Sequence, residues 1–197
     1  MFLCDFCTFS VFFCFGWTVD IFRFVFNNGS NISGFVPLGG GCMESLDLAG
    51  MRRAVEEAEK ALAAGEIPVG AAIYHGETLL WADHNRREET GDPTAHAEML
   101  CLRKGAEALG DWRLNECTLY VTLEPCPMCA GALVMSRLGR CVFGAYDPEK
   151  GCCGSVYDLP ADPLLHANTV WEHGVLESEC LELLRRGFRP LRPKGEK

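Results

Sequence analysis

The stretches TAHAE (residues 94–98) and LEPCPMC (residues 123–129) concentrate side chains that bind metals. Together they supply one histidine and two cysteines in C-x-x-C spacing, namely His96, Cys126 and Cys129. Imidazole and thiolate groups are preferred zinc ligands, and three protein ligands leave the fourth tetrahedral position open. A structural zinc normally has four protein ligands. The spacing therefore predicts a zinc ion that holds a reactive water, with Glu98 beside it as a proton carrier.

Helix-start signals occur in both stretches. A helix-forming run follows Thr94, which predicts an N-cap at Thr94 with His96 and Glu98 in the first turn. Proline suits the first helical position, so Pro127 makes Cys126 the expected cap of a second helix. Unpaired amides and the positive end of a helix favour thiolate, the form that zinc binds. We expect two helix N-termini to face one cation.

The cysteines also admit a structural zinc ribbon or a redox pair, with His96 as an ordinary buried imidazole. A ribbon needs a second C-x-x-C pair at ribbon spacing, and Cys101 and Cys117 do not supply one. The H-x-E and P-C-x-x-C halves occur together in the expected order, which favours the catalytic interpretation. The helix dipole alone also favours an acidic residue at Glu98, and this structural role is compatible with proton transfer.

The first 42 residues differ in composition from the rest of the chain. They hold ten of the twelve phenylalanines and only three charged residues, Asp5, Asp20 and Arg23. A signal peptide opens with positive charge, and the apolar run at residues 6–19 is shorter than a bilayer span. We therefore expect residues 1–42 to be a disordered extension or the product of a start codon placed too early, with Met43 as the natural first residue. A membrane-surface extension is the alternative.

Residues 43–197 have the length and composition of one domain. Their apolar patterns predict helices at residues 51–62, 96–109, 127–137 and 177–186, and strands at residues 69–74, 78–81, 118–122 and 140–145. Alternating strands and helices predict an α/β fold, a three-layer helix-sheet-helix sandwich with a mixed sheet. The first two strands form an antiparallel hairpin in this prediction, and the later strands are parallel.

Further strings extend the motif beyond the metal-binding residues. They are PVGA at residues 68–71, Asn85, DPTAHAE at residues 92–98, LEPCPMCAGA at residues 123–132 and GAYD at residues 144–147. With them the sequence resembles the bacterial tRNA-specific adenosine deaminases, a branch of the cytidine deaminase-like superfamily. The similarity covers about residues 44–192 and leaves out the N-terminal stretch.

The resemblance implies a reaction and a role for each motif residue. His96, Cys126 and Cys129 would bind one zinc ion per subunit, and Glu98 would shuttle protons. Asn85 would contact the flipped nucleoside, and Asp147 would lie in a loop near the substrate nucleotide. The implied reaction is hydrolytic deamination of adenosine to inosine at the wobble position of a tRNA anticodon, using a zinc-activated water. We expect a cytoplasmic homodimer with a cytidine deaminase-like fold and no membrane association.

The net charge of −9 is unusual for a protein that binds RNA, because such proteins usually present a basic face. Basic residues nevertheless concentrate near the site and the C-terminus, as Arg86, Arg87, Lys150, Arg185, Arg186, Arg189, Arg192, Lys194 and Lys197. With the loop at residues 147–155 they form either a phosphate-binding strip or, at the C-terminus, a solvated tail. The family pattern is broken at His166-Ala167-Asn168 and at Gly187-Phe188, in regions that the family uses to hold RNA.

Two other functions are compatible with the same motifs. One is deamination of a free base or nucleoside of the guanine or cytosine type. The other is a zinc-stabilised binding module without catalysis, which the open coordination position and Glu98 disfavour.

Overall fold

The computed structural model describes residues 9–15, 18–24, 40–167 and 169–187, with side chains from residue 46 onward. The chain divides into two compact units, Met1–Ser45 and Leu46–Lys197. In the first unit β1 (Phe9–Phe15) and β2 (Thr18–Phe24) pair antiparallel. The predicted division at residue 42 stays a prediction. Predictions that involve Asn168 and residues 188–197 lie outside the described residues.

The second unit contains a five-stranded sheet in the order β4-β3-β5-β6-β7. Its strands are β3 (Gly70–His75), β4 (Thr78–His84), β5 (Cys117–Leu123), β6 (Arg140–Ala145) and β7 (Val170–His173). The β3 strand pairs antiparallel with β4 and β5, whereas β5–β6 and β6–β7 are parallel. The predicted mixed sheet is confirmed.

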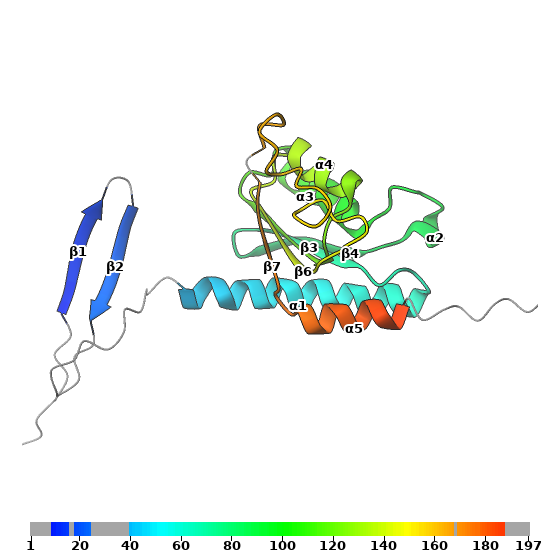
Figure 1. Ribbon diagram of the computed structural model, residues 1–197, viewed down its shortest axis with the longest axis horizontal. Coiled ribbons are helices and arrows are strands. Elements are labelled where there is room, and N and C mark those ends of the chain that lie inside the picture. Colours follow the sequence, from blue (N-terminus) through cyan, green and yellow to red (C-terminus); the bar gives the residue numbers. More distant parts are fainter. Residues whose placement is uncertain (1–8, 16–17, 25–39, 168, 188–197) are drawn as a thin grey trace, which may run out of the picture. The chain divides into compact units, whose positions relative to one another are not determined.

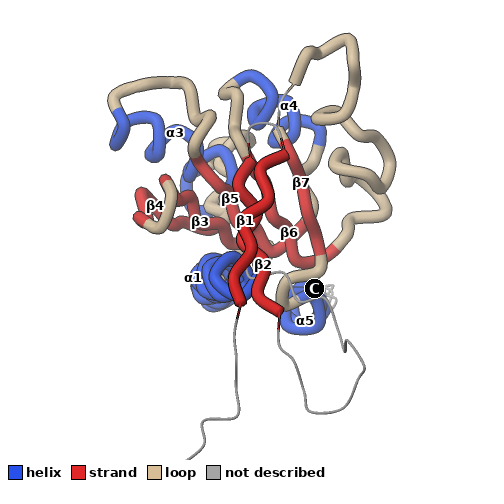
Figure 2. Tube along the Cα trace, turned by 90° about the vertical axis from the view of Figure 1, so that its left-hand side faces the viewer, coloured by secondary structure: helices blue, strands red, loops and turns tan. Residues whose placement is uncertain are grey.

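Helices cover both faces of this sheet (Figures 1 and 2). On one face lie α1 (Gly40–Ala64) and α5 (Glu177–Gly187), and on the other lie α3 (Ala97–Leu109) and α4 (Pro127–Met135). A short helix, α2 (Arg87–Thr90), follows β4. The three-layer α/β sandwich predicted from the sequence is therefore confirmed.

The helix α1 packs directly against β3 through its backbone. A Cβ atom added at Gly70 would collide with the carbonyl oxygen of Ala54 and the amide nitrogen of Ala58. These are backbone atoms of a helix, which cannot turn aside as a flexible side chain would. Gly70 is therefore required by the close approach of α1, and a larger residue there would force the two elements apart.

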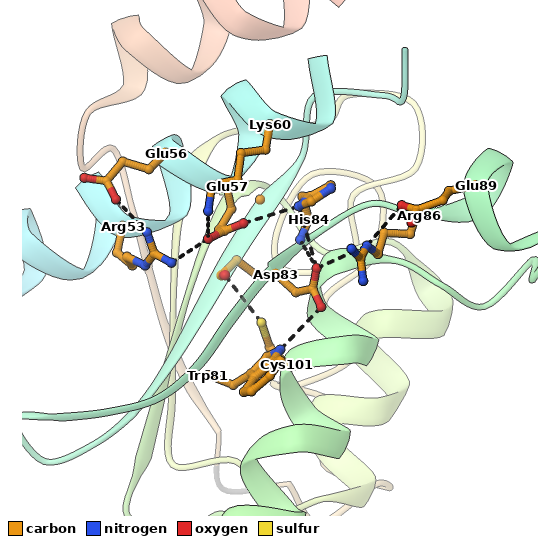
Figure 3. Close-up of polar contacts among 12 residues, drawn as sticks. Arg53, Glu56, Glu57, Lys60, Trp81, Asp83, His84, Arg86, Glu89 and Cys101 are labelled. Atoms are coloured by element: carbon orange, nitrogen blue, oxygen red, sulfur yellow. Dashed lines mark hydrogen bonds and ion pairs between the residues drawn. The ribbon is translucent and has the colours of Figure 1, made fainter. Parts of the chain in front are cut away.

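A buried carboxylate also joins α1 to β4 (Figure 3). Glu57 is 4% exposed and accepts hydrogen bonds from Arg53 at 2.6 Å and from Lys60 at 2.8 Å. Its second oxygen lies 3.3 Å from Nδ1 of His84, at the end of β4. These cationic and polar partners outweigh burial and hold the pKa of Glu57 below its ordinary value. Glu57 therefore remains charged inside the helix-sheet contact.

Two elements were not expected from the sequence. Strand β7 has three exposed residues out of four and no alternating pattern, so it lacks the signal of a half-buried strand. Helix α2 has four residues and none is buried. In the part of the chain that the structure describes, no helix is long and apolar enough to cross a bilayer.

Candidate active site

The two predicted helix N-termini meet at the carboxyl ends of the parallel strands. Cys126 is the N-cap of α4, Pro127 occupies the first turn and Cys129 follows, as predicted. On the other helix the N-cap is His96, so the prediction of Thr94 was wrong. The backbone amide and the hydroxyl of Thr94 both donate to Asp92 at 2.7 Å, which forms a separate turn before the helix.

The histidine and the two cysteines have the spacing of a zinc site. Nδ1 of His96 lies 3.7 Å from Sγ of Cys126 and 3.5 Å from Sγ of Cys129. Zinc bonds of about 2.0 Å to nitrogen and about 2.3 Å to sulfur, at a tetrahedral angle, place nitrogen and sulfur about 3.6 Å apart. The three ligand atoms all lie within 4.8 Å of one another. Their geometry and chemistry therefore fit one zinc ion with an open fourth position.

Charge at this cluster is favourable for metal binding and proton transfer. The Cys129 thiol, followed by His96, lowers the pKa of Cys126 to about 4, so Cys126 is a thiolate at neutral pH. Glu98, in the first turn of α3, is 4% exposed, and its burial raises its pKa. A carboxyl group with a raised pKa can both take and return a proton near neutral pH.

A cavity of about 470 Å³ opens beside these residues. His96, Glu98 and Cys126 line it, together with residues from β4–α2, from the segment after β6 and from α5. Such a volume falls in the range of small-molecule sites. The cavity brings every sequence-predicted site residue to one place except Cys129, which lies fully buried behind it.

Asn85 lies on one wall of the cavity, as the sequence analysis expected. It is 5% exposed, and its amide Nδ2 donates to Oε2 of Glu66 at 2.9 Å. Glu66 had no predicted role. Its partner is 19 positions away, and a single acidic residue before Pro68 carries no signal of that contact.

Asp147 lies on a second wall, formed by the segment at residues 146–150. One of its oxygens accepts hydrogen bonds from the backbone amides of Glu149 at 3.0 Å and Lys150 at 3.2 Å. This oxygen therefore shapes the loop itself. The other carboxylate oxygen has no hydrogen bond to any residue that the structure describes, so it remains available to a ligand.

Glu124 holds this loop to the strand that precedes the cysteines. It is 2% exposed, and its carboxylate accepts the backbone amides of Asp147 at 3.0 Å, Cys153 at 2.9 Å and Ser155 at 3.0 Å. The Ser155 hydroxyl donates a further hydrogen bond. Glu124 was quoted in the sequence motif without a role, because its partners are backbone amides that a sequence does not single out.

The basic residues predicted to bind phosphate do not act as one group. Arg87 and Lys150 line the cavity, and neither forms an ion pair with another described residue. Arg86 is paired with Glu89 at 3.1 Å, and Arg186 is paired with Glu59 at 2.7 Å. The best-placed cations for an RNA backbone are therefore Arg87 and Lys150.

Known proteins share both the motif and the fold. The family model described as the cytidine and deoxycytidylate deaminase zinc-binding region matches residues 44–145. The tRNA-specific adenosine deaminase of Bacillus subtilis (strain 168) is 46% identical over 144 residues, which cover 73% of this chain and 89% of the relative. The chain belongs to the tRNA-specific adenosine deaminase family. As a member of this family it is a zinc-dependent deaminase.

Other tRNA-specific adenosine deaminases and solved structures agree with this placement. The enzyme of Aquifex aeolicus (strain VF5) is 43% identical over 142 residues, covering 72% of this chain and 93% of its own. A structure from a study of A-to-I editing by tRNA:A34 deaminases has a TM-score of 0.67 and 39% identity, and covers 69% of this chain and 99% of its own. A structure of NE0047 in complex with 8-azaguanine has a TM-score of 0.61 and 26% identity, covering 72% of this chain and 84% of its own.

Proposed function

We propose that this chain converts adenosine to inosine at the wobble position of a tRNA anticodon. The observation that carries the proposal is a cavity of about 470 Å³ in which a buried glutamate, Glu98, stands beside a three-ligand zinc geometry. This arrangement provides hydrolytic deamination, and the relatives named above act on tRNA.

In the proposed reaction His96, Cys126 and Cys129 hold the zinc ion. Zinc, when bound, lowers the pKa of a water molecule toward neutrality and so supplies hydroxide. Glu98 accepts the proton of that water and delivers it to the ring nitrogen next to the carbon that is attacked. Glu98 then assists proton transfer to the amine. Water oxygen is joined to the ring carbon, the carbon–nitrogen bond breaks, and ammonia leaves.

An anticodon loop suits this cavity, because a looped-out adenosine costs less to extrude than a paired one. We assign Asn85 and Asp147 to substrate binding, and Arg87 and Lys150 to the neighbouring phosphates. A tRNA substrate implies a cytoplasmic location. We also propose that residues 43–197 form the whole deaminase domain.

We further propose that the enzyme is a homodimer. Large apolar side chains are exposed on α4 and on the segment between β6 and β7, with Met135 at 75%, Tyr157 at 66% and Leu164 at 83%. Exposed apolar surface of this kind is typical of protein interfaces. Sedimentation of the full chain tests the proposal, and a monomer at micromolar concentration would contradict it.

Inosine analysis tests the reaction. The full chain, loaded with zinc, is incubated with an RNA hairpin that carries one anticodon-loop adenosine, and digested nucleosides are separated by chromatography. We expect inosine in this hairpin and none when the adenosine is base-paired in a stem. A parallel panel of free guanine, cytosine and adenosine covers the alternative. Turnover of a free base without inosine in the hairpin would replace the tRNA assignment with a small-molecule one.

A further inference from the structure

The hydrogen bond between Glu66 and Asn85 fixes which end of the Asn85 amide faces the cavity. Nδ2 of Asn85 donates to Oε2 of Glu66 at 2.9 Å, and both side chains are about 95% buried (4% and 5% exposed). A carboxylate only accepts hydrogen bonds, so the amide nitrogen must point to Glu66 and the carbonyl oxygen Oδ1 away from it. Among the described residues Oδ1 accepts no hydrogen bond, although Asn85 lines the cavity.

Glu66 is itself held rigidly. Its backbone amide donates to the carbonyl of Ala61 at 2.9 Å, at the end of α1. The second carboxylate oxygen accepts the backbone amide of Glu89 in α2 at 2.8 Å. Both oxygens are therefore used, each by one donor, and neither can release its partner without leaving a buried polar group unpaired.

The same contacts fix the backbone on either side of Asn85. Its amide donates to the carbonyl of Val69 at 2.9 Å, and the amide of Arg86 donates to Ala95 at 3.0 Å. The Arg86 side chain lies between Asp83 and Glu89, which links the end of β4 to α2 (Figure 3). Only the rotation of the Asn85 amide is left to be decided, and Glu66 decides it.

We propose that Glu66 is a positioning residue for substrate recognition, which holds Asn85 with its carbonyl oxygen toward the cavity. This wall of the site therefore selects a nucleoside that presents a hydrogen-bond donor, an amino or hydroxyl group, to Asn85. The proposal rests on the function proposed above and names a residue behind the binding surface. Glu66 lies outside the metal-binding residues and does not itself contact the substrate.

Exchanging the two side chains tests the proposal. Glu66→Gln brings an amide where two donors must be accepted, so Asn85 turns its oxygen toward the new amide and its nitrogen into the cavity. We expect KM for the RNA hairpin to rise about tenfold, with kcat less affected and zinc content unchanged. Asn85→Asp alone also fails, because two carboxylates then face each other.

The double variant Glu66→Gln, Asn85→Asp restores the pattern with the same total charge. The introduced glutamine donates to the introduced aspartate and still accepts the amide of Glu89, and an acceptor oxygen again faces the cavity. We expect it to recover most of the lost kcat/KM. A double variant no better than the worse single one would reduce Glu66 to a structural role and overturn the proposal.

Glu57→Gln is the matched control. Glu57 is as buried as Glu66, at 4% exposure, and has charged partners, but it does not line the cavity. We expect this variant to lower the melting temperature while KM stays within about twofold of wild type. An equal rise in KM in both variants would mean that general destabilisation causes the effect, against the proposal.

An NMR measurement without RNA separates this inference from the proposed function. The side-chain NH2 of Asn85 in the full chain should be protected from solvent exchange, and Glu66→Gln but not Glu57→Gln should change that protection. An exposed, rapidly exchanging Asn85 amide in wild type overturns the inference even if inosine is formed. Absence of inosine from wild type, with Asn85 protected, defeats only the proposed reaction.

Discussion

Arg140 of β6 holds Asp47 of α1 through two parallel hydrogen bonds. Nη1 lies 2.6 Å from Oδ1, and Nη2 lies 2.8 Å from Oδ2. The Tyr120 hydroxyl donates to the same carboxylate at 2.8 Å, and Arg140 also reaches Glu172 of β7 at 2.7 Å. One guanidinium thus joins α1, β6 and the edge strand β7, in a paired geometry that is strong for a charged hydrogen bond.

Asp47→Asn should lower the free energy of unfolding at neutral pH by about 1–3 kcal/mol, because it removes a charged partner of Arg140. Arg140 holds the pKa of Asp47 below its ordinary value of 3.8. The contribution of Asp47 is therefore complete above pH 3.8 and is lost as pH falls through the lower folded-state pKa. Urea unfolding of wild type and variant should show a gap at pH 7 that closes in acid. A gap that is independent of pH would contradict the assignment.

Gly70→Ala should destabilise the second unit by about 1–3 kcal/mol, since the added Cβ meets backbone atoms of α1. Gly131→Ala in α4 is the control. Its Cβ would meet nothing within 4 Å, and alanine in a helix should stabilise by about 1 kcal/mol. Thermal unfolding of both variants measures the two shifts, which should have opposite signs. A neutral Gly70→Ala would mean that α1 does not approach β3 so closely.

Cys126→Ser should lose most of its bound zinc, because a hydroxyl is a harder and weaker ligand than the thiolate it replaces. Cys152→Ser, at a buried cysteine outside the proposed ligand set, should keep one zinc per chain. Metal analysis after dialysis gives both values. Full zinc in Cys126→Ser would require another ligand.

Glu98→Gln should reduce turnover of the RNA hairpin by at least about 100-fold while zinc is retained, because an amide cannot exchange protons as a carboxylate does. The substitution keeps the size of the side chain and its place in the first turn of α3. Single-turnover rates and zinc content should be measured on the same preparation. Near-wild-type turnover would exclude Glu98 as the proton carrier.

Arg87→Ala and Lys150→Ala should each reduce the slope of log K against log salt concentration by about one, if each contacts one phosphate. Arg186→Ala should change the slope less, since Arg186 is already paired with Glu59. Fluorescence anisotropy of a labelled hairpin at several salt concentrations gives the slopes. Equal slopes for wild type and both cavity variants would place the RNA backbone elsewhere.

The metal-binding half of the site could be predicted because its information is local. Proline at 127 leaves few positions other than a helix start, and this places Cys126 and Cys129 correctly. The start of α3 was misplaced by two residues, because Asp92 captures the amide and hydroxyl that would have made Thr94 a cap. Competition between neighbouring acceptors is not visible in a residue pattern.

The walls of the cavity could be predicted only in part, because their contacts are distant in sequence. Asn85 and Asp147 were expected from the resemblance, and both line the cavity. Glu66 and Glu124, which hold those walls, act on groups 19 to 31 positions away. Strand β7 was missed for a related reason, since it is specified by pairing with β6 and not by its own burial pattern.

The way Glu124 holds residues 147–155 makes that wall an exchangeable part. Its carboxylate grips backbone amides, which every residue except proline has, so it imposes little on side-chain identity. Gly151 is the exception, because a Cβ there would collide with the carboxylate. A library that varies residues 148–150 and keeps Glu124 and Gly151 should therefore retain the fold and the zinc site. Selection from such a library offers a route to deaminases for other nucleosides without redesign of the metal chemistry.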